Sequence, residues 1–184
     1  MDKLFVLIIE GTTRPNRESI KVARFVEEIG RTIDEIEVQL IKPEDFNLPY
    51  DGDEYTDPKF TELTKKADAF FIVTPEYNHS YPGSLKRLLD SEFANYKHKP
   101  VALAGVSNGQ WGGTRAIEAL LHPLKTMGMV MLRPDVQFPD IETLFDEQGR
   151  AKDEKYEKRL RSLYHELIWM TKALKWGREN LPTE

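Results

Sequence analysis

Short apolar runs alternate with amphipathic segments along the chain. Uninterrupted apolar stretches are typical of strands buried on both faces of a sheet, and the segment 36–41 alternates apolar and polar residues in the way of a half-exposed strand. Pro100 opens one of these runs, where a missing N–H is tolerated. We therefore predict five strands, at 4–9, 36–41, 69–73, 100–106 and 129–132, the last with a possible extension through Val136 and Phe138.

The segments between these runs carry apolar residues at helical spacing. We predict helices at 20–29, 60–66, 85–93, 115–127 and 152–175, and a loop at 46–58. Pro123 lies inside the fourth helix, which we expect it to kink or interrupt. The last helix is the longest and carries a broad apolar stripe, whereas the charges near its start alternate in sign as on a solvated face.

Strands that alternate with helices predict an α/β fold, in which a doubly wound parallel sheet has helices on both faces. In such sheets ligands bind beyond the carboxyl ends of the strands, at the point where the strand order reverses. This rule directs attention to the turns after the first, third and fourth strands. The length of 184 residues and the lack of any linker predict a single domain at 1–184.

Composition excludes several classes of chemistry. The chain has no cysteine, so disulfides, thiolate catalysis and cysteine-bound metals are ruled out, and any redox chemistry needs a bound cofactor. A net charge of −5 without a clustered basic face argues against nucleic acid as a partner. No apolar run is long enough for a membrane span, and no cleavable leader is evident, so we expect a cytoplasmic protein with no membrane partner.

The turn after the first strand, "EGTTRPNRES" at 10–19, combines a glycine, hydroxyl groups and two arginines just before a predicted helix. The N–H groups and positive dipole of a helix N-terminus attract anions, and guanidinium and hydroxyl groups complete a phosphate site. The turn matches neither the Walker loop nor the dinucleotide fingerprint. It predicts a site for a mononucleotide phosphate; the alternative is a plain loop that ends in a Ser19 N-cap.

The turn after the third strand, within "TPEYNHSYPGSLKRLLD" at 74–90, holds more functional groups than a turn needs. Pro75 and Pro82 stiffen the backbone, which suits the edge of a flat ligand that meets N–H and C=O groups. Glu76 has no visible partner in the sequence, so it is weak evidence for acid–base catalysis. Ser80 or Ser84 could cap the following helix.

The turn after the fourth strand, "GVSNGQWGGTR" at 105–115, contains four glycines. Glycine lets a flat ligand lie close to the backbone or permits positive φ angles. Trp111 could act as a lid over a site or as a plug in the core. The alternative is that the glycines serve the fold alone.

Together the three turns resemble those of the NAD(P)H-dependent FMN reductases of the flavodoxin-like fold, a group that includes azoreductases, quinone reductases and chromate-reducing flavoproteins. The first turn matches G-[ST]-x-R…S, residues 75–86 match P-E-Y-N-x-S-x-P-G-x-L-K at every specified position, and residues 107–113 match S-x-G-x-x-G-G. The resemblance covers about residues 4–128, and the middle motif is the specific one.

The resemblance implies a flavodoxin-like three-layer fold with strand order 2-1-3-4-5 and a bound FMN. The phosphate would be held by Thr12, Arg14 and Ser19, with Arg17 as a helper. The edge of the isoalloxazine ring would be lined, chiefly through backbone groups, by Pro75, Glu76, Tyr77 and Asn78. The pyrimidine end of the ring would be bordered by Ser107, Gly109, Gly112 and Gly113.

The resemblance also implies partners. The family usually forms homodimers or homotetramers, with the helix 85–93 and the loop around 50–55 as candidate contacts.

Glu18, in the phosphate turn, is unfavourable near an anion unless it points to solvent.

The function implied is transfer of hydride from NADPH or NADH, through bound FMN, to a small acceptor such as a quinone, azo compound, free flavin or metal oxyanion. No catalytic side chain is needed, because the cofactor carries the chemistry. Two alternatives stay open: a flavodoxin-type electron carrier that serves protein partners, and a flavin-binding sensor that does not oxidise nicotinamide. A site for a different mononucleotide is a remote third.

Overall fold

The computed structural model describes residues 2–48 and 56–182. In this part of the chain a parallel sheet has the order β2-β1-β3-β4-β5, with β6 paired to β4, which confirms the predicted order 2-1-3-4-5. The strands are β1 Leu4–Glu10, β2 Ile36–Ile41, β3 Ala69–Pro75, β4 Pro100–Val106, β5 Val130–Met131 and β6 Val136–Phe138.

The helices follow the strands in the predicted alternation. They are α1 Ser19–Arg31, α2 Pro58–Lys66, α3 Gly83–Asp90, α4 Thr114–Thr126, α5 Ile141–Leu144 and α6 Lys155–Asn180, with short 3₁₀ turns η1 Pro43–Asp45 and η2 Ala94–Tyr96. Asp57 caps α2 by accepting hydrogen bonds from the amides of Lys59 and Phe60. No helix in the two described ranges is both long enough and apolar enough to span a membrane.

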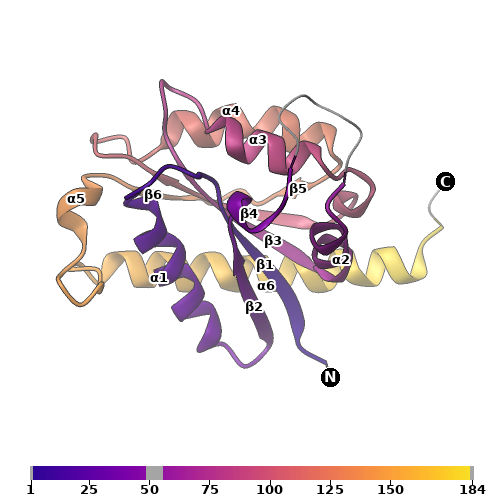
Figure 1. Cartoon of the computed structure of the whole chain (residues 1–184). Coiled ribbons are helices and arrows are strands. Elements are labelled where there is room, and N and C mark those ends of the chain that lie inside the picture. Colours follow the sequence, from indigo (N-terminus) through magenta and orange to yellow (C-terminus); the bar gives the residue numbers. More distant parts are fainter. Residues whose placement is uncertain (1, 49–55, 183–184) are drawn as a thin grey trace.

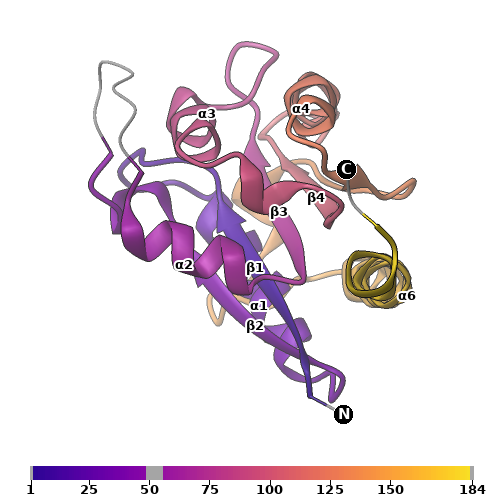
Figure 2. The same cartoon turned by 90° about the vertical axis from the view of Figure 1, so that its right-hand side faces the viewer.

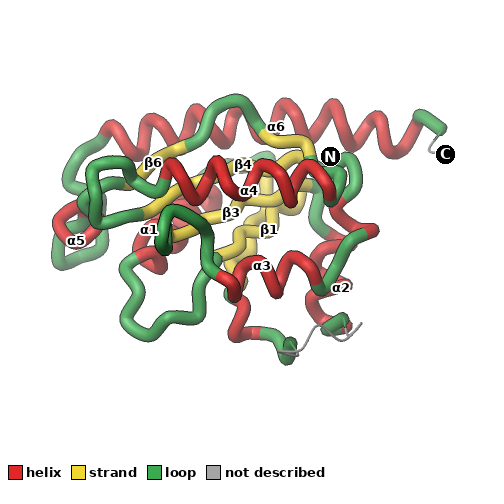
Figure 3. The backbone as a smooth tube through the Cα atoms, turned by 90° about the horizontal axis from the view of Figure 1, so that it is seen from above, coloured by secondary structure: helices red, strands yellow, loops and turns green. Residues whose placement is uncertain are grey.

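The sheet divides the core into two layers because successive side chains of a strand point to opposite faces. In β1, Val6 and Ile8 join a cluster with α1 and α6, whereas Leu7 and Ile9 join a cluster with α2, α3 and α4. Every residue of β1 is buried. Figures 1 and 2 show this arrangement, with α1 and α6 on one side of the strands and α2, α3 and α4 on the other. Seen from above, α3 and α4 lie in front of the strands and α6 behind them (Figure 3).

The fifth strand differs from the prediction. The backbone between 129 and 138 forms two short strands: β5 pairs with the start of β4, and β6 pairs with its end. Pro134 lies between them; it lacks an N–H for the ladder and restricts Arg133 before it. The apolar pattern therefore continues across a break in the hydrogen-bonded strand.

The fourth helix also differs. Pro123 does not interrupt α4, which runs through that residue to Thr126; the alternative, a kink at Pro123, stays a prediction. Pro123 lies in the last turn, where little helix follows it, and the amide of Met127 still donates to its carbonyl over 2.9 Å. The apolar positions Ile117, Leu120 and Leu124 keep this helix on the sheet.

Candidate functional site

The three polar turns meet beyond the carboxyl ends of β1, β3 and β4. The Tyr77 hydroxyl lies 3.1 Å from Thr12 Oγ1, and the guanidinium of Arg14 lies over the Tyr77 ring at 5.5 Å, which joins the first turn to the second. The Glu76 amide donates to the Val106 carbonyl over 2.9 Å, which joins the second turn to the third. The sheet order thus brings together segments that lie far apart in sequence.

Two hollows flank the contact between Arg14 and Tyr77. One has a volume of about 450 Å³ and is lined by all three turns, at residues 14–19, 75–77 and 106–108, together with Ile141 and Glu142. The other, of about 600 Å³, is lined by residues 12–14, 76–78 and 82–84. Both volumes lie in the range of small-molecule sites.

The first turn can follow this path only because residue 11 is glycine. A Cβ there would lie 2.9 Å from Leu85 Cδ2 and 3.3 Å from the Val73 carbonyl oxygen. The Gly11 carbonyl accepts a hydrogen bond from the Ser84 hydroxyl over 3.2 Å, so the start of α3 holds the turn in place. Ser84 therefore serves the turn, and neither Ser80 nor Ser84 caps α3, whose N-cap residue is Pro82.

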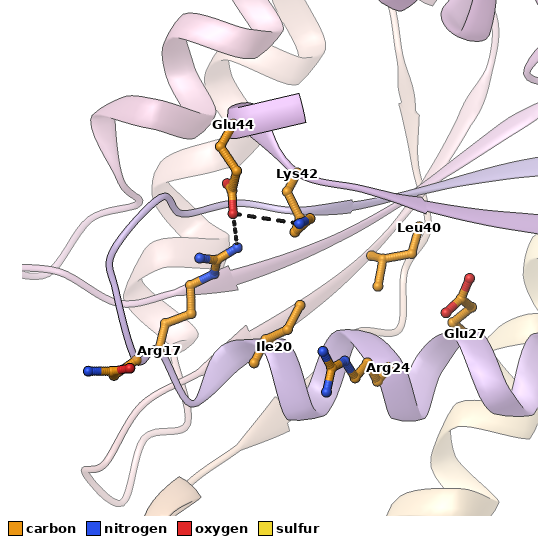
Figure 4. Close-up of a pocket in the computed structure, with 8 residues that line it drawn as sticks. Arg17, Ile20, Arg24, Glu27, Leu40, Lys42 and Glu44 are labelled. Atoms are coloured by element: carbon orange, nitrogen blue, oxygen red, sulfur yellow. Dashed lines mark hydrogen bonds and ion pairs between the residues drawn. The ribbon is translucent and has the colours of Figure 1, made fainter. Parts of the chain in front are cut away.

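The two arginines of the first turn have different surroundings. Arg14 is exposed and, in the part of the chain that the structure describes, takes part in no ion pair. Arg17 is largely buried: Nε donates to Glu10 Oε2 over 2.8 Å, and Nη2 pairs with Glu44, as Figure 4 shows. Arg14 is thus the uncompensated cation of this turn.

Ser19 is buried and does not cap α1 with its side chain. Its hydroxyl donates to Glu10 Oε1 over 2.6 Å, and the N-cap residue is Glu18. Glu10 is fully buried at the end of β1, and this burial raises the pKa of its carboxyl group, although the hydrogen bonds from Ser19 and Arg17 act in the other direction. Glu18 is partly exposed and pairs with Lys21, but it also lines the hollow of about 450 Å³, so its carboxylate borders the candidate site.

The second turn is a tight two-residue reversal. The amide of Tyr77 donates to the Ser80 carbonyl over 2.8 Å, and the Ser80 amide donates back over 3.0 Å. Asn78 and His79 occupy its tip with φ angles of 50° and 64°, values that Asn and His tolerate better than most residues. The amides of Glu76 and Tyr77 are therefore already hydrogen-bonded within the protein. The backbone contacts predicted between this stretch and the flavin are left to its carbonyl groups and to the tip of the turn.

Glu76 does have a partner, which the sequence did not reveal. Its carboxylate accepts hydrogen bonds from the Arg115 amide over 3.2 Å and from Arg115 Nη1 over 3.3 Å. Arg115 in turn lies over the exposed ring of Trp111 at 5.9 Å. Trp111 is therefore not a core plug, and Glu76 is held as a fixed carboxylate at the junction of two turns.

The glycines of the third turn fall into two kinds. Gly113 has a φ of +85°, and a Cβ there would lie 2.3 Å from the Val106 amide nitrogen; Gly112 is confined in the same way against Gln137. Gly109 is different, because a Cβ there would meet nothing closer than Ser107 Oγ at 4.0 Å. Gly112 and Gly113 thus let the turn pack on β4 and β6, and Gly109 leaves open surface.

The chain is similar in sequence to proteins of known activity. The sequence model of the family described as NADPH-dependent FMN reductase matches residues 4–142. The chain belongs to this family. A quinone reductase of Pseudomonas putida is 30% identical over 80% of this chain and 84% of its own length, and one of Escherichia coli is 32% identical over the same shares.

Solved structures agree with this assignment. The flavoenzyme NAD(P)H:(acceptor) oxidoreductase FerB of Paracoccus denitrificans superposes with a TM-score of 0.75 at 25% identity, over 92% of this chain and 98% of that one. A flavodoxin of Pseudomonas aeruginosa superposes with a TM-score of 0.63 at 16% identity, over 90% of this chain and 99% of that one, a likeness of fold alone. This member of the FMN reductase family is therefore an FMN-dependent oxidoreductase that uses NAD(P)H as electron donor, as predicted, and the electron-carrier alternative is not favoured.

The site suits the FMN that an FMN reductase needs. Arg14 supplies an uncompensated cation at the N-terminal end of α1, where helix amides attract a phosphate. The hollow lined by all three turns has a volume of about 450 Å³, and its lining includes Tyr77 of the second turn and Asn108 of the third. No cluster of three or more metal-ligating side chains occurs within residues 2–48 and 56–182, and His79 stands alone at its turn.

Sequence reasoning missed the carboxylates that organise the first turn. Glu10 opens the first turn, but the sequence predicted no role for it, and Glu44 lies beyond β2, outside the three turns. An ionisable residue directly after an uninterrupted apolar run was the available signal for Glu10, because such a buried charge needs partners. Nothing in the sequence pointed to Glu44.

Proposed function

We propose that this FMN reductase holds the flavin in the hollow where the three turns meet. The phosphate lies at the first turn, with Arg14 as the cation and Thr12 on the adjoining wall. Ser19 and Arg17 hold the backbone of the turn in place, because the Ser19 hydroxyl and Arg17 Nε donate to the buried carboxylate of Glu10. The observation that carries the proposal is Arg14, an exposed cation with no ion pair among the described residues, which lines the hollow bounded by all three motifs.

The ring of the flavin lies between the second and third turns. The stretch of Pro75, Glu76, Tyr77 and Asn78 borders one edge, and Ser107 with Gly109 borders the pyrimidine end. Gly112 and Gly113 would not contact the flavin themselves. They let the third turn fold back on β4. The bond from Arg115 fixes Glu76, which therefore positions the turn and does not transfer protons.

Bound FMN would supply the redox chemistry between NAD(P)H and the acceptor. The role of the protein is to bind and orient the flavin at the three turns, where donor and acceptor would reach it. The acceptor is a small oxidant, with quinones and azo compounds as first choices: quinone reductases are among the relatives, and an NADPH azoreductase of a Bacillus species is 34% identical over 62% of this chain.

An anaerobic titration tests the proposal. The purified protein is loaded with FMN, the excess is removed, and the visible flavin band is followed on addition of NADPH or NADH and then of a quinone. We expect bleaching by at least one nicotinamide and recovery with the quinone. A protein that takes up no FMN contradicts the site, and bound FMN that neither nicotinamide bleaches supports the sensor alternative.

The remaining expectations stay predictions. A homodimer or homotetramer is consistent with the 62% exposed Phe93 just after α3, the helix predicted for that contact, whereas the loop 50–55 lies outside the described residues. A single domain and a cytoplasmic location are likewise predictions. Size-exclusion chromatography with light scattering measures the oligomeric state directly.

A further inference from the structure

We propose that Glu44, acting through Arg17, is a specificity-determining residue that limits how strongly the first turn selects phosphorylated flavin over riboflavin. This inference rests on the proposed flavin site. It concerns a carboxylate that lies outside all three sequence motifs.

The guanidinium of Arg17 donates hydrogen bonds to three different acceptors. Nε donates to Glu10 over 2.8 Å, Nη1 donates to the Arg14 carbonyl over 3.3 Å, and Nη2 pairs with Glu44. Figure 4 shows Arg17 reaching from the end of the first turn to Glu44, and Lys42 pairing with the same carboxylate oxygen. The orientation of Arg17 is therefore set by two carboxylates from two different elements, β1 and η1.

The charges around this turn nearly cancel. Arg17 is matched by Glu10 and Glu44, and the Lys42 ammonium lies 3.8 Å from Glu44 and 3.4 Å from Asp45. Of the two arginines of this turn, Arg14 is the one that has no carboxylate partner among the described residues. A phosphate at this turn therefore meets the attraction of Arg14, while that of Arg17 is offset by anions close by.

Glu44 and Glu10 are not equivalent in this arrangement. Glu10 is fully buried and accepts from both Ser19 and Arg17, so its charge is part of the core of the turn. The Glu44 side chain is 36% exposed and belongs to a single 3₁₀ turn beyond β2. Glu44→Gln removes this charge and keeps a side-chain oxygen that can accept from Arg17 Nη2, which makes Glu44 the adjustable member of the pair.

The consequence is specific to the phosphate. Neutralising Glu44 leaves Arg17 less compensated and raises the positive potential at the turn, so FMN binds more tightly. Riboflavin carries no phosphate and is unaffected. The ratio of the riboflavin Kd to the FMN Kd isolates this effect from changes in ring binding, and the difference shrinks at high salt.

The test measures both dissociation constants by quenching of flavin fluorescence, in the full chain at low and high ionic strength. We expect Glu44→Gln to raise the riboflavin-to-FMN ratio about three- to tenfold. The chain offers a control in Glu37→Gln: Glu37 lies near the start of β2, at the end of the sheet away from the three turns, its side chain is 59% exposed, and it too is paired with a cation, Lys66. We expect that control to change the ratio by less than about twofold.

Two further variants complete the design. Glu44→Ala repeats the test without a side-chain carbonyl that could still accept from Arg17. In an Arg17→Gln background, Glu44→Gln should have no effect on the ratio, because the coupling between the two residues is lost. Circular dichroism melting curves check that each variant is folded.

The outcomes separate the two proposals. Equal effects of Glu44→Gln and Glu37→Gln overturn the inference in favour of general charge. Weaker FMN binding by both Glu44 variants also overturns it, by showing that Arg17 must be held by Glu44. An effect that persists in the Arg17→Gln background overturns it as well. In each of these cases the wild type still prefers FMN; a wild type without that preference overturns the proposed phosphate site itself.

Discussion

The hydroxyl of Tyr77 lies 3.1 Å from Oγ1 of Thr12, although 65 residues separate them in the chain. The Arg14 amide donates to the same Thr12 oxygen over 3.2 Å, and the Arg14 guanidinium covers the Tyr77 ring. One hydroxyl pair thus connects the phosphate turn to the turn that borders the flavin ring.

Tyr77→Phe removes this connection while keeping the ring. We expect FMN to bind about three- to tenfold more weakly, because the first turn loses one of its fixed partners, and the free energy of unfolding to fall by no more than about 1 kcal/mol. Flavin fluorescence and denaturant titration measure the two quantities. Tyr81→Phe, at a tyrosine that is also partly buried, is the control; the same loss of affinity there argues against a role for the Thr12 contact.

Arg14→Gln removes the uncompensated cation. A charge-assisted hydrogen bond contributes about 1.5–3 kcal/mol, so we expect the FMN Kd to rise roughly 10- to 100-fold with no change for riboflavin. Arg24→Gln is the matched control, since Arg24 is an exposed arginine on α1. Equal losses in the two variants would show that the net charge of this face matters and not the position of Arg14.

Gly113→Ala tests the packing of the third turn. A methyl group at this position meets the Val106 amide nitrogen at 2.3 Å and also sits on a φ of +85°, so we expect a loss of at least about 3 kcal/mol in the free energy of unfolding. Gly149 has a similar φ of +78° but open space around it, so Gly149→Ala should cost about 1 kcal/mol from backbone strain alone. Equal costs in chemical denaturation would mean that the close packing is relieved elsewhere.

Lys99 makes stability depend on pH. Its ammonium is buried, donates to the carbonyls of Thr64 and Lys65 over 2.7 and 3.2 Å, and has a pKa lowered by burial to about 8 from an ordinary value of 10.5. Between pH 8 and 10 the folded protein has released this proton while the unfolded chain still holds it, so stability rises with pH. The gain is at most about 1.4 kcal/mol per pH unit.

Lys99→Met should abolish that rise, and Lys97→Met, at an exposed neighbour, should keep it. Denaturant titrations at pH 7, 8, 9 and 10 measure the slope. The window closes near pH 10, because burial raises the pKa of Tyr96 and of Tyr164, and their ionisation in the unfolded chain then lowers stability. A wild type with a flat profile from pH 8 to 10 would contradict the prediction.

The sequence by itself determined the order of the elements and the sheet. Periodicity is a local property, so apolar runs marked the strands, and their alternation with helices predicted a doubly wound parallel sheet. The order 2-1-3-4-5, which the structure shows, was implied by the family resemblance. The three turns could be chosen in advance because parallel strands bring their carboxyl ends to one edge. The motifs in those turns then indicated the family, which the comparisons confirm.

Only the tertiary structure decided how each side chain in those turns is used. Local pattern could not reveal that Arg17 and Ser19 are held by Glu10, that Glu76 is bonded to Arg115, or that the strand after 129 divides in two. These outcomes depend on partners from other elements, since a buried charge or amide is satisfied by whatever group the fold brings near. The identity of a polar residue predicts that it needs a partner, and the packing of the sheet selects which one.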